Sequence, residues 1–317
     1  MKVITLGTGS GRPTLKRNVS AVAVVWEGEW ILFDCGEATQ IQMMKADLSL
    51  SRLTAIFITH LHGDHFNGLA GLLSTIGLNG RERPLSIIGP PGIRSYLDLL
   101  RKLRIVFVNY PAQVREFSEE EFSSGESTAG RPRAEAVLPV FATERYGVSA
   151  HPLDHRLYAI GYRVEARAKP GRFDLERARA LMVPEGPMFG RLQAGYEVTL
   201  ADGRTVHPSE VLGPPRPGRK MSYCTDTRPC TGSVLLSRDV DLMIHEATFG
   251  EGLEAEAAEY GHSTSVQAAR VAAEARPGRL LLTHISSRYP DASILLKEAR
   301  QCFPDTELAQ DLMETPV

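Results

Sequence analysis

The chain has 317 residues, 43% hydrophobic and 23% charged, a composition that supports a packed core and excludes global disorder. Its formal net charge is −2, which excludes a general basic surface for nucleic acid, so any such footprint must be local. No apolar run approaches the roughly 20 residues of a membrane helix, and Met1–Gly7 lacks the apolar core of a signal peptide. We therefore expect a cytoplasmic protein without a membrane partner, whose four cysteines are free thiols.

Short apolar runs rich in β-branched residues alternate with helical patterns along the chain. Strands are predicted at residues 3–6, 21–25, 30–33, 55–59, 85–88, 158–164, 220–224, 242–245 and 280–283. Helices are predicted at residues 38–46, 68–78, 93–103, 265–275 and 292–302. This mixture places the protein in the α/β class.

Two stretches interrupt the rhythm of strands and helices. Residues 117–133 contain an acidic cluster, Glu119 to Glu121, followed by serine and glycine, which predicts a solvated surface loop to which we assign no function. Residues 166–217 are rich in arginine, glycine and proline. A linker of this length is unusual inside a compact chain, so we expect this segment to protrude and to have some structure of its own.

The strongest chemical signal is the segment 57–65, FITHLHGDH, in which an apolar strand runs into an HxHxDH motif. His60 and His62 are two residues apart, so in extended backbone their rings point the same way. Gly63 permits a sharp turn, after which Asp64 and His65 can face the same point from the start of a helix. Four ligands in six residues exceed what one tetrahedral zinc with an open catalytic position can use, so we expect two metal ions.

The remaining ligands should come from the ends of other strands. His155, Asp226 and His284 each lie beside an apolar run, where a rigid scaffold holds a ligand well. His151 competes with His155 for the same role, and the local sequence leaves that choice open.

The HxHxDH motif, with a later His, Asp and His, resembles the metallo-β-lactamase superfamily. Further segments are similar to one branch of it, the ribonuclease Z family. They are 7–9 (GTG), 13–18 (PTLKRN, similar to the PxKxRN loop), 33–40 (FDCGEATQ), 245–248 (the HEAT motif), 262–264 (the HST motif) and 283–289 (THISSRY). The resemblance covers nearly the whole chain, although 117–133 is longer than usual for the family.

This resemblance implies an αββα sandwich, with residues 1–317 forming one domain and a dinuclear metal site at one edge. Residues 166–217 would be an inserted exosite arm that grips the elbow of tRNA, and the protein would be a homodimer. In the family the ligand stands six residues before the glycine of a GYR triplet, here 161–163, which selects His155 over His151.

The resemblance also assigns roles to individual residues. One zinc ion would take His60, His62 and His155, the second would take Asp64, His65 and His284, and Asp226 would bridge them, giving two Zn²⁺ per subunit. Asp64 would also orient or deprotonate the attacking water. His262, held by Glu246, would protonate the leaving 3′-oxygen.

Contacts to the substrate are expected at three places. Arg288 is a candidate phosphate clamp, because a guanidinium binds phosphate with two hydrogen bonds. Lys16, Arg17 and Asn18 would meet the acceptor end of tRNA. Gly186-Pro187 resembles a glycine-proline feature of the exosite arm. Between positions 163 and 191 the chain carries seven basic and four acidic residues, a local excess of positive charge that suits phosphate contacts.

The predicted activity is zinc-dependent cleavage of the 3′ trailer from precursor tRNA after the discriminator nucleotide. The products would be a 3′-hydroxyl on the tRNA and a 5′-phosphate on the trailer. The first alternative is a hydrolase of the same fold that acts on a small phosphodiester or (thio)ester; such enzymes generally lack the arm and the HEAT and HST motifs. The second is a non-catalytic RNA-binding scaffold, which the full set of ligands argues against.

Overall fold

The computed structural model describes residues 1–26, 28–123 and 136–317. The chain forms two compact units: residues 1–143, 147–164 and 220–317 make the first, and residues 144–146 and 165–219 make the second. Most of the segment predicted as a loop at 117–133, namely 124–133, lies outside the described residues.

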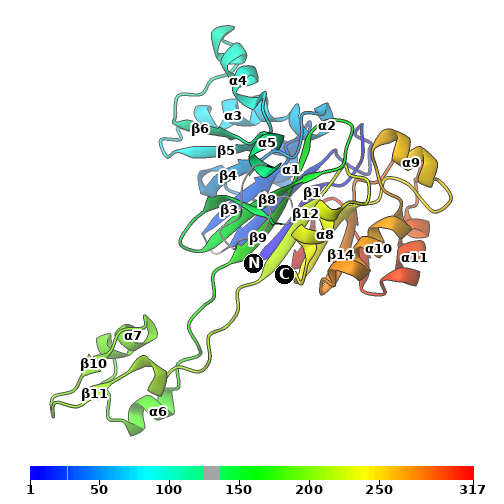
Figure 1. Ribbon diagram of the computed structural model, residues 1–317. Helices are drawn as coiled ribbons and strands as arrows, with labels where there is room; N and C mark the ends of the chain where they lie inside the picture. The colour runs from blue at the N-terminus through cyan, green and yellow to red at the C-terminus, as the bar shows by residue number, and fades with distance from the viewer. Residues whose placement is uncertain (27, 124–135) are drawn as a thin grey trace. The chain divides into compact units, whose positions relative to one another are not determined.

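The first unit contains two seven-stranded sheets (Figure 1). The first sheet has the strand order β16-β1-β2-β3-β4-β5-β6. Its strands are β1 (Lys2–Gly7), β2 (Ala21–Trp26), β3 (Glu29–Phe33), β4 (Leu53–Phe57), β5 (Leu85–Gly89), β6 (Ala112–Glu116) and β16 (Met313–Pro316). The pairs from β3 to β6 are parallel, whereas the pairs β16–β1, β1–β2 and β2–β3 are antiparallel.

The second sheet has the order β15-β14-β13-β12-β9-β8-β7. Its strands are β7 (Leu138–Ala142), β8 (Tyr146–Leu153), β9 (Ala159–Ala166), β12 (Lys220–Cys224), β13 (Leu242–Glu246), β14 (Arg279–Thr283) and β15 (Thr306–Leu308). β12 to β15 are parallel. Parallel strands buried on both faces need continuous apolar sequence, as in Leu280-Leu281-Leu282, where every side chain is fully buried.

Aromatic side chains join the two sheets face to face. Phe33 and Phe57 of the first sheet stack at 5.1 Å and pack against Tyr162 of the second, and Phe33 also contacts Tyr223. The Tyr162 hydroxyl donates a hydrogen bond to the Ile58 carbonyl at 2.7 Å, so its polar atom is satisfied inside the apolar layer. This packing forms the inner two layers of an αββα sandwich.

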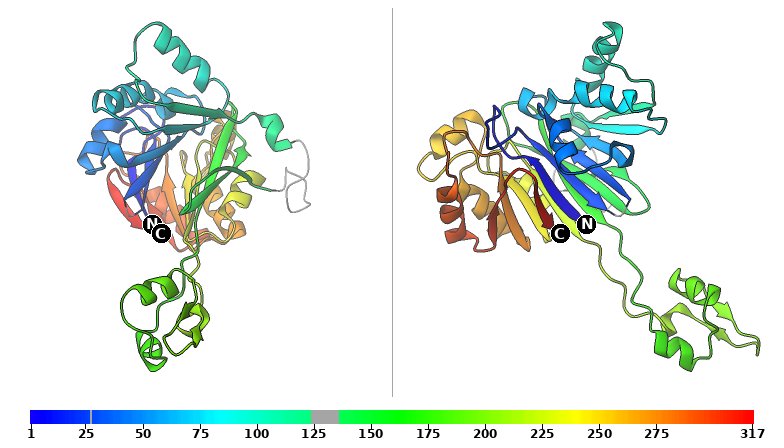
Figure 2. Two further views of the ribbon diagram at one scale, coloured as in Figure 1. Left: turned by 90° about the vertical axis from the view of Figure 1, so that its left-hand side faces the viewer. Right: turned by 180° about the vertical axis from the view of Figure 1, so that it is seen from behind.

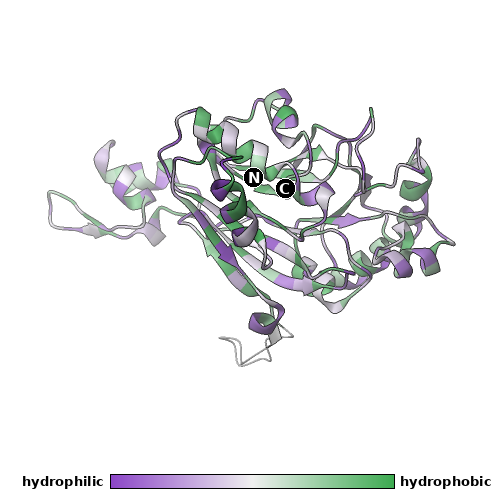
Figure 3. Cartoon of the chain, turned by 90° about the horizontal axis from the view of Figure 1, so that it is seen from above, coloured by the Kyte–Doolittle hydropathy of each residue, from purple (hydrophilic) through white to green (hydrophobic). Residues whose placement is uncertain are grey.

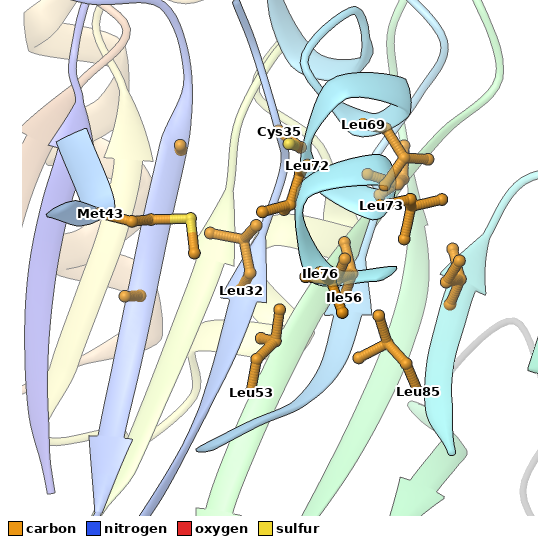
Figure 4. Packing of buried hydrophobic residues seen from close by; sticks show 14 of the residues in the cluster. Leu32, Cys35, Met43, Leu53, Ile56, Leu69, Leu72, Leu73, Ile76 and Leu85 are labelled. Atoms are coloured by element: carbon orange, nitrogen blue, oxygen red, sulfur yellow. The ribbon is translucent and has the colours of Figure 1, made fainter. Parts of the chain in front are cut away.

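Helices cover the outer faces of both sheets (Figures 1 and 2). α1 (Thr39–Lys45) and α3 (Leu69–Leu78) lie on the first sheet. Figure 4 shows Leu69, Leu72, Leu73 and Ile76 of α3 turned toward the strands, at the i, i+3, i+4 and i+7 spacing of one helix face. α8 (Thr231–Ser237), α10 (Ser265–Ala275) and α11 (Ser293–Cys302) pack on the second sheet. In Figure 3 the helices carry both hydrophilic and hydrophobic residues, as expected for helices on a surface.

Further short helices connect these elements along the described parts of the first unit. They are α2 (Gly63–Phe66), α4 (Ile93–Lys102), α5 (Glu119–Ser123), α9 (Glu254–Tyr260) and the 3₁₀ turn η1 (Leu50–Arg52). No helix among the described residues is both long and apolar enough to cross a membrane.

The second unit has secondary structure and a small core of its own. It contains α6 (Leu175–Ala180), α7 (Pro187–Gln193), the hairpin of β10 (Val198–Thr199) and β11 (Thr205–Val206), and the 3₁₀ turn η3 (Pro208–Glu210). Asp174 caps α6 by accepting a hydrogen bond from the Arg177 amide. The buried apolar residues that hold this unit together are Ala178, Val183, Leu192, Val198, Leu200, Val206 and Val211.

Every strand and helix predicted from the sequence is present, most within two residues of the expected ends. The strand expected at 55–59 was wrong at its end: β4 stops at Phe57, because the Thr59 amide bonds to the Asp34 carboxylate instead of continuing the ladder. The solvated loop expected from residue 117 was also wrong in its described part. There Glu119–Ser123 forms α5, and Phe117 and Phe122 are buried.

Candidate active site

The HxHxDH motif leaves β4 and enters the single-turn helix α2. His62 is its extended N-cap, and Asp64 and His65 lie in the first turn, so the turn brings both side chains back toward His60. Glycine leaves room here for the Asn67 side chain, whose amide nitrogen would lie 2.5 Å from a Cβ at position 63 and would have to move. Four candidate ligands from one continuous segment therefore converge on the same place.

The structure brings all seven predicted metal ligands together in two neighbouring groups. The first comprises His60, His62, His155 and Asp226, and the second comprises Asp64, His65 and His284, with the ligand atoms of each group within 4.8 Å of one another. Asp226 and His284 also form a third such group with His262, which the sequence predicted as a catalytic residue and not as a ligand. Asp226 lies between the groups. Its Oδ1 is 3.1 Å from Nε2 of both His65 and His284, and its Oδ2 is 3.6 Å from Nε2 of His60.

Hydrogen bonds on the outer side of the rings determine which nitrogen faces inward. Nδ1 of His60 bonds to the Thr59 hydroxyl at 3.0 Å, and Nδ1 of His65 bonds to Asp34 at 2.8 Å. When Nδ1 carries the proton, Nε2 presents a lone pair, which is the form that binds a metal.

Of the other three rings, those of His155 and His284 also use Nδ1 for an outward hydrogen bond, and that of His62 does not. Nδ1 of His155 donates to the Gly261 carbonyl at 2.7 Å, and Nδ1 of His284 lies 3.0 Å from the Thr248 hydroxyl. Gly261 has a positive φ, and a Cβ there would lie 2.7 Å from the His155 ring, so only glycine permits this contact. His62 is the exception, because its Nδ1 is the atom that faces His60 and His155, at 3.0 and 3.3 Å.

This donor set fits divalent metal ions. Nε2 of His65 and Nε2 of His284 face each other at 3.1 Å, although both rings already use Nδ1 for outward hydrogen bonds. Two lone pairs at that distance repel unless a proton or a cation lies between them. Imidazole and carboxylate ligands suit zinc, and the seven ligands divide between two centres.

The charges around the cluster also favour bound metal ions. Burial, the main cause, lowers the pKa of His60, His62 and His155, which favours the neutral ligand form. Burial also acts to lower the pKa of His65, but Asp226, Asp34 and Asp64 together raise it well above its usual value. This concentration of carboxylates around one imidazole calls for positive charge, which a metal dication would supply in place of the proton.

His262 lies beside the cluster and is held by Glu246. Its Nδ1 is 2.9 Å from Oε1 of Glu246, a fully buried carboxylate that also accepts the Thr227 amide at 2.7 Å. Burial acts to lower the pKa of His262, but the charge and hydrogen bond of Glu246, aided by Asp226, raise it to about 9. The His262 side chain is 14% exposed, so the ring is oriented from within yet open to a substrate.

Arg288 is fixed close to His262. Its guanidinium donates to Glu256 at 2.8 Å and lies over the Phe249 ring at 4.6 Å, and the Phe249 and His262 rings are 6.1 Å apart. The side chain remains 40% exposed. A phosphate at the mouth of the site could therefore reach it.

The segment 13–18 lies next to the site, but its residues differ in what they can contact. Arg17 points inward and donates to the Thr8 hydroxyl and to a backbone carbonyl, and Asn18 donates to the Glu37 carbonyl, so both hold the loop in shape. Lys16 is exposed at a cavity of about 190 Å³. Letter by letter, Leu15 stands where PxKxRN has its lysine, and the lysine follows one position later.

Other residues singled out in the sequence lie elsewhere. His151 bonds through Nδ1 to the neighbouring Pro152 carbonyl and belongs to neither metal group. Arg163, counted with the basic stretch, is buried and donates to carbonyls of residues 236 and 238. Gly186 has a φ of 115° and precedes Pro187, the first residue of α7 in the second unit.

The residues that orient the candidate ligands were not predicted from the sequence. Asp34 accepts hydrogen bonds from His65, from the Thr59 amide and hydroxyl, and from the Tyr223 hydroxyl. Thr248 bonds to both Glu246 and His284. A carboxylate directly after an apolar strand, as at Asp34, was the available signal for one of them.

Comparison with known proteins agrees with this geometry. A family model described as the beta-lactamase superfamily domain matches residues 192–285, and one described as anti-Pycsar protein Apyc1 matches residues 1–100. Ribonuclease Z of Salinibacter ruber is 49% identical over 311 residues, which cover 98% of this chain and 92% of that protein. Ribonuclease Z of a Cyanothece species is 45% identical over 322 residues, 99% of this chain and 94% of that protein.

A solved structure extends the likeness to three dimensions. The short form of human tRNase Z superposes with a TM-score of 0.72 at 32% identity, covering all of this chain and 99% of that one. Fold and site together define a hydrolase of the metallo-β-lactamase fold, as the sequence predicted. Within that class the chain belongs to the ribonuclease Z family, and it is an endoribonuclease.

Proposed function

We propose that the protein removes the 3′ trailer of precursor tRNA by one cut after the discriminator nucleotide. The observation that carries the proposal is the two-group His/Asp cluster with His262 held beside it by a separate carboxylate. A phosphodiester hydrolase needs both: ligands for metal ions, and an acid for the leaving oxygen. Relatives at 42–49% identity over nearly the whole chain bear the name ribonuclease Z.

His60, His62 and His155 would hold one zinc ion, Asp64, His65 and His284 the other, and Asp226 would bridge them. When bound, two zinc ions would activate the attacking water and stabilise charge on the attacking and leaving oxygens. Asp64 would orient or deprotonate that water; it already accepts the Gly11 amide at 2.8 Å, which fixes the carboxylate. His262 would donate its Nε2 proton to the leaving 3′-oxygen, while Glu246 keeps Nδ1 occupied.

Outside the cluster, Arg288 would clamp a phosphate, and Lys16 would approach the acceptor end of the tRNA. Arg17 and Asn18, predicted as substrate contacts, would act by shaping the loop that carries Lys16. The cytoplasmic location stays a prediction from the sequence.

The second unit would be the exosite arm. It carries Arg172, Arg177 and Arg191 as exposed cations on a small scaffold with its own core, and Gly186-Pro187 begins α7 among them. Contacts of this kind bind phosphate without reading base sequence. The arm would thus raise affinity for tRNA without taking part in the bond cleavage.

We also propose a homodimer, as the family resemblance implies. Apolar side chains are exposed on α1, α3, α4 and the chain that follows α4, which suits a partner surface: Ile41, Met44, Leu78, Leu99, Leu103, Ile105 and Phe107. The molecular mass in solution, measured by light scattering, would test this.

The test of function is cleavage of a 3′-extended precursor tRNA by the zinc-loaded protein, with both product ends mapped to the nucleotide. We expect one cut after the discriminator. Deleting residues 167–208 should raise KM for the precursor strongly and leave hydrolysis of bis(p-nitrophenyl) phosphate intact. Good hydrolysis of the small ester without any cut in the tRNA would favour the small-molecule alternative, and equal loss on both substrates would mean that the second unit is structural.

A further inference from the structure

Thr248 lies at the junction between the Glu246–His262 pair and the second metal group. Its hydroxyl oxygen is 2.6 Å from Oε2 of Glu246 and 3.0 Å from Nδ1 of His284. The side chain is buried, at 4% exposure, so solvent does not substitute readily for either partner. The backbone amide of Thr248 also donates to Oε2 of Glu246, at 3.2 Å, which fixes the carboxylate from a second direction.

The chemistry of a hydroxyl determines the direction of these bonds. A threonine hydroxyl has one hydrogen and two lone pairs. Two groups that can only accept lie within reach of this hydroxyl, Oε2 of Glu246 at 2.6 Å and the backbone carbonyl of His284 at 3.1 Å. The hydrogen points to Glu246, because that contact is the shorter one and a carboxylate is the stronger acceptor. A lone pair of the hydroxyl then faces Nδ1 of His284, which must carry a proton to complete the bond. Nε2 of His284 is thereby left as a lone pair toward Asp64 and His65, at 3.3 and 3.1 Å.

Glu246 therefore acts on two rings at once. Through Oε1 it holds His262 directly, and through Oε2 and the Thr248 hydroxyl it sets the protonated nitrogen of His284. We propose that Thr248 is a positioning residue that couples the Glu246–His262 pair to the metal-facing nitrogen of His284. The effect on cleavage rests on the proposed function, whereas the effect on metal binding does not.

Substitution of Thr248 by valine or by serine distinguishes a hydrogen-bonding role of the hydroxyl from a packing role of the methyl group. Valine has nearly the shape of threonine without the hydroxyl, so Thr248→Val leaves Nδ1–H of His284 without its acceptor in a buried site. Thr248→Ser keeps the hydroxyl and loses only a methyl group. A matched control is Thr315→Val in β16, where the threonine is also buried, at 2% exposure, and its hydroxyl has no hydrogen-bond partner among the residues described.

The experiment measures zinc affinity by competition with a chromophoric chelator, zinc content per chain, and single-turnover cleavage of precursor tRNA at saturating zinc. For Thr248→Val we expect one of the two zinc affinities to fall by about 10–100-fold, the range found when a hydrogen-bond partner of a metal ligand is removed. The cleavage rate should stay low even at saturating zinc, because Glu246 also loses a donor that orients it toward His262. Thr248→Ser should restore both quantities to within a few-fold of the parent, and Thr315→Val should match the parent.

Two results would overturn the proposal. One is a Thr248→Val protein whose zinc affinities and cleavage rate equal those of Thr315→Val. The other is a Thr248→Ser protein as impaired as Thr248→Val, which would assign the effect to the methyl group and to packing. If the parent protein cuts no RNA, the proposed function fails, and the zinc titration still decides the role of Thr248.

Discussion

Two carboxylate–threonine pairs flank the cluster, one from each sheet. The two pairs have the same arrangement of hydrogen bonds. Asp34 follows β3 and pairs with Thr59, while Glu246 ends β13 and pairs with Thr248. In each pair the threonine hydroxyl donates to the carboxylate and accepts from Nδ1 of a histidine, and the carboxylate itself holds a second histidine.

The pairs differ in what their second histidine faces. The ring held by Asp34 is His65, which is fully buried, with Nε2 aimed at Asp226 and His284. The ring held by Glu246 is His262, whose side chain is 14% exposed and lies at the edge of the cluster. Under the proposed function, the same local chemistry would make a metal ligand where Nε2 meets other candidate ligands, and a general acid where Nε2 meets the substrate.

The largest effect should come from His262→Ala, which removes the ring on the exposed side. We expect the rate of tRNA cleavage to fall by about 10²–10⁴-fold, the usual contribution of a general acid, while zinc content stays near two per chain. Rapid-quench kinetics and elemental analysis on the same preparation would measure both. Loss of one zinc ion would identify His262 as a ligand and remove the contrast between the two pairs.

Asp34→Asn should show a different pattern, with metal binding and stability impaired together. Four donor groups converge on Asp34, so an amide NH₂ there would face other donors in a buried site. We expect zinc affinity to fall by about 10–100-fold and unfolding free energy to fall by about 1–3 kcal/mol. Chelator competition and urea denaturation of the metal-free protein check the two effects separately. Unchanged zinc affinity would mean that Asp34 does not position His65.

The sequence reveals the candidate ligands more readily than the residues that orient them. HxHxDH is recognisable because four ligands fall within six residues, and the fold follows from the apolar runs of the buried strands. Asp34, in contrast, meets Thr59, His65 and Tyr223 at separations of 25, 31 and 189 residues. No local pattern encodes such contacts. Those with Thr59 and His65 arise when β3 pairs with β4, and the one with Tyr223 arises when the two sheets pack.

Edge elements escaped prediction for a different physical reason. β6 alternates exposed and half-exposed residues and includes charged side chains, so its sequence lacks the continuous apolar run of the central strands. α5 lies in an acidic stretch, where only Phe117 and Phe122 mark a buried side. Weak hydrophobic periodicity at an edge is compatible with a loop, and tertiary packing decides between the two.

The smallest effect in the comparison should come from Thr59→Val. It leaves Nδ1–H of His60 without its acceptor, but Asp34 remains to hold His65, so only one ring is released. We expect a loss of about 1–3 kcal/mol in unfolding free energy and a smaller loss of zinc affinity than in Asp34→Asn. Thermal unfolding with and without zinc would measure this, with Thr59→Ser as the matched control. A larger loss of zinc affinity than in Asp34→Asn would mean that Thr59 contributes more to zinc binding than Asp34, contrary to this prediction.

We infer that outward hydrogen bonds fix which atom of each ring would meet a metal ion and keep His262 outside the metal shell. A crystal structure of the zinc-loaded protein, with anomalous data at the zinc edge, tests it directly. We predict two zinc ions, with Nδ1 of His62 and Nε2 of His60, His65, His155 and His284 as ligands, and His262 bound to Glu246 alone. A single zinc ion, a zinc ion on His262, or a ring turned to use its other nitrogen would contradict the claim.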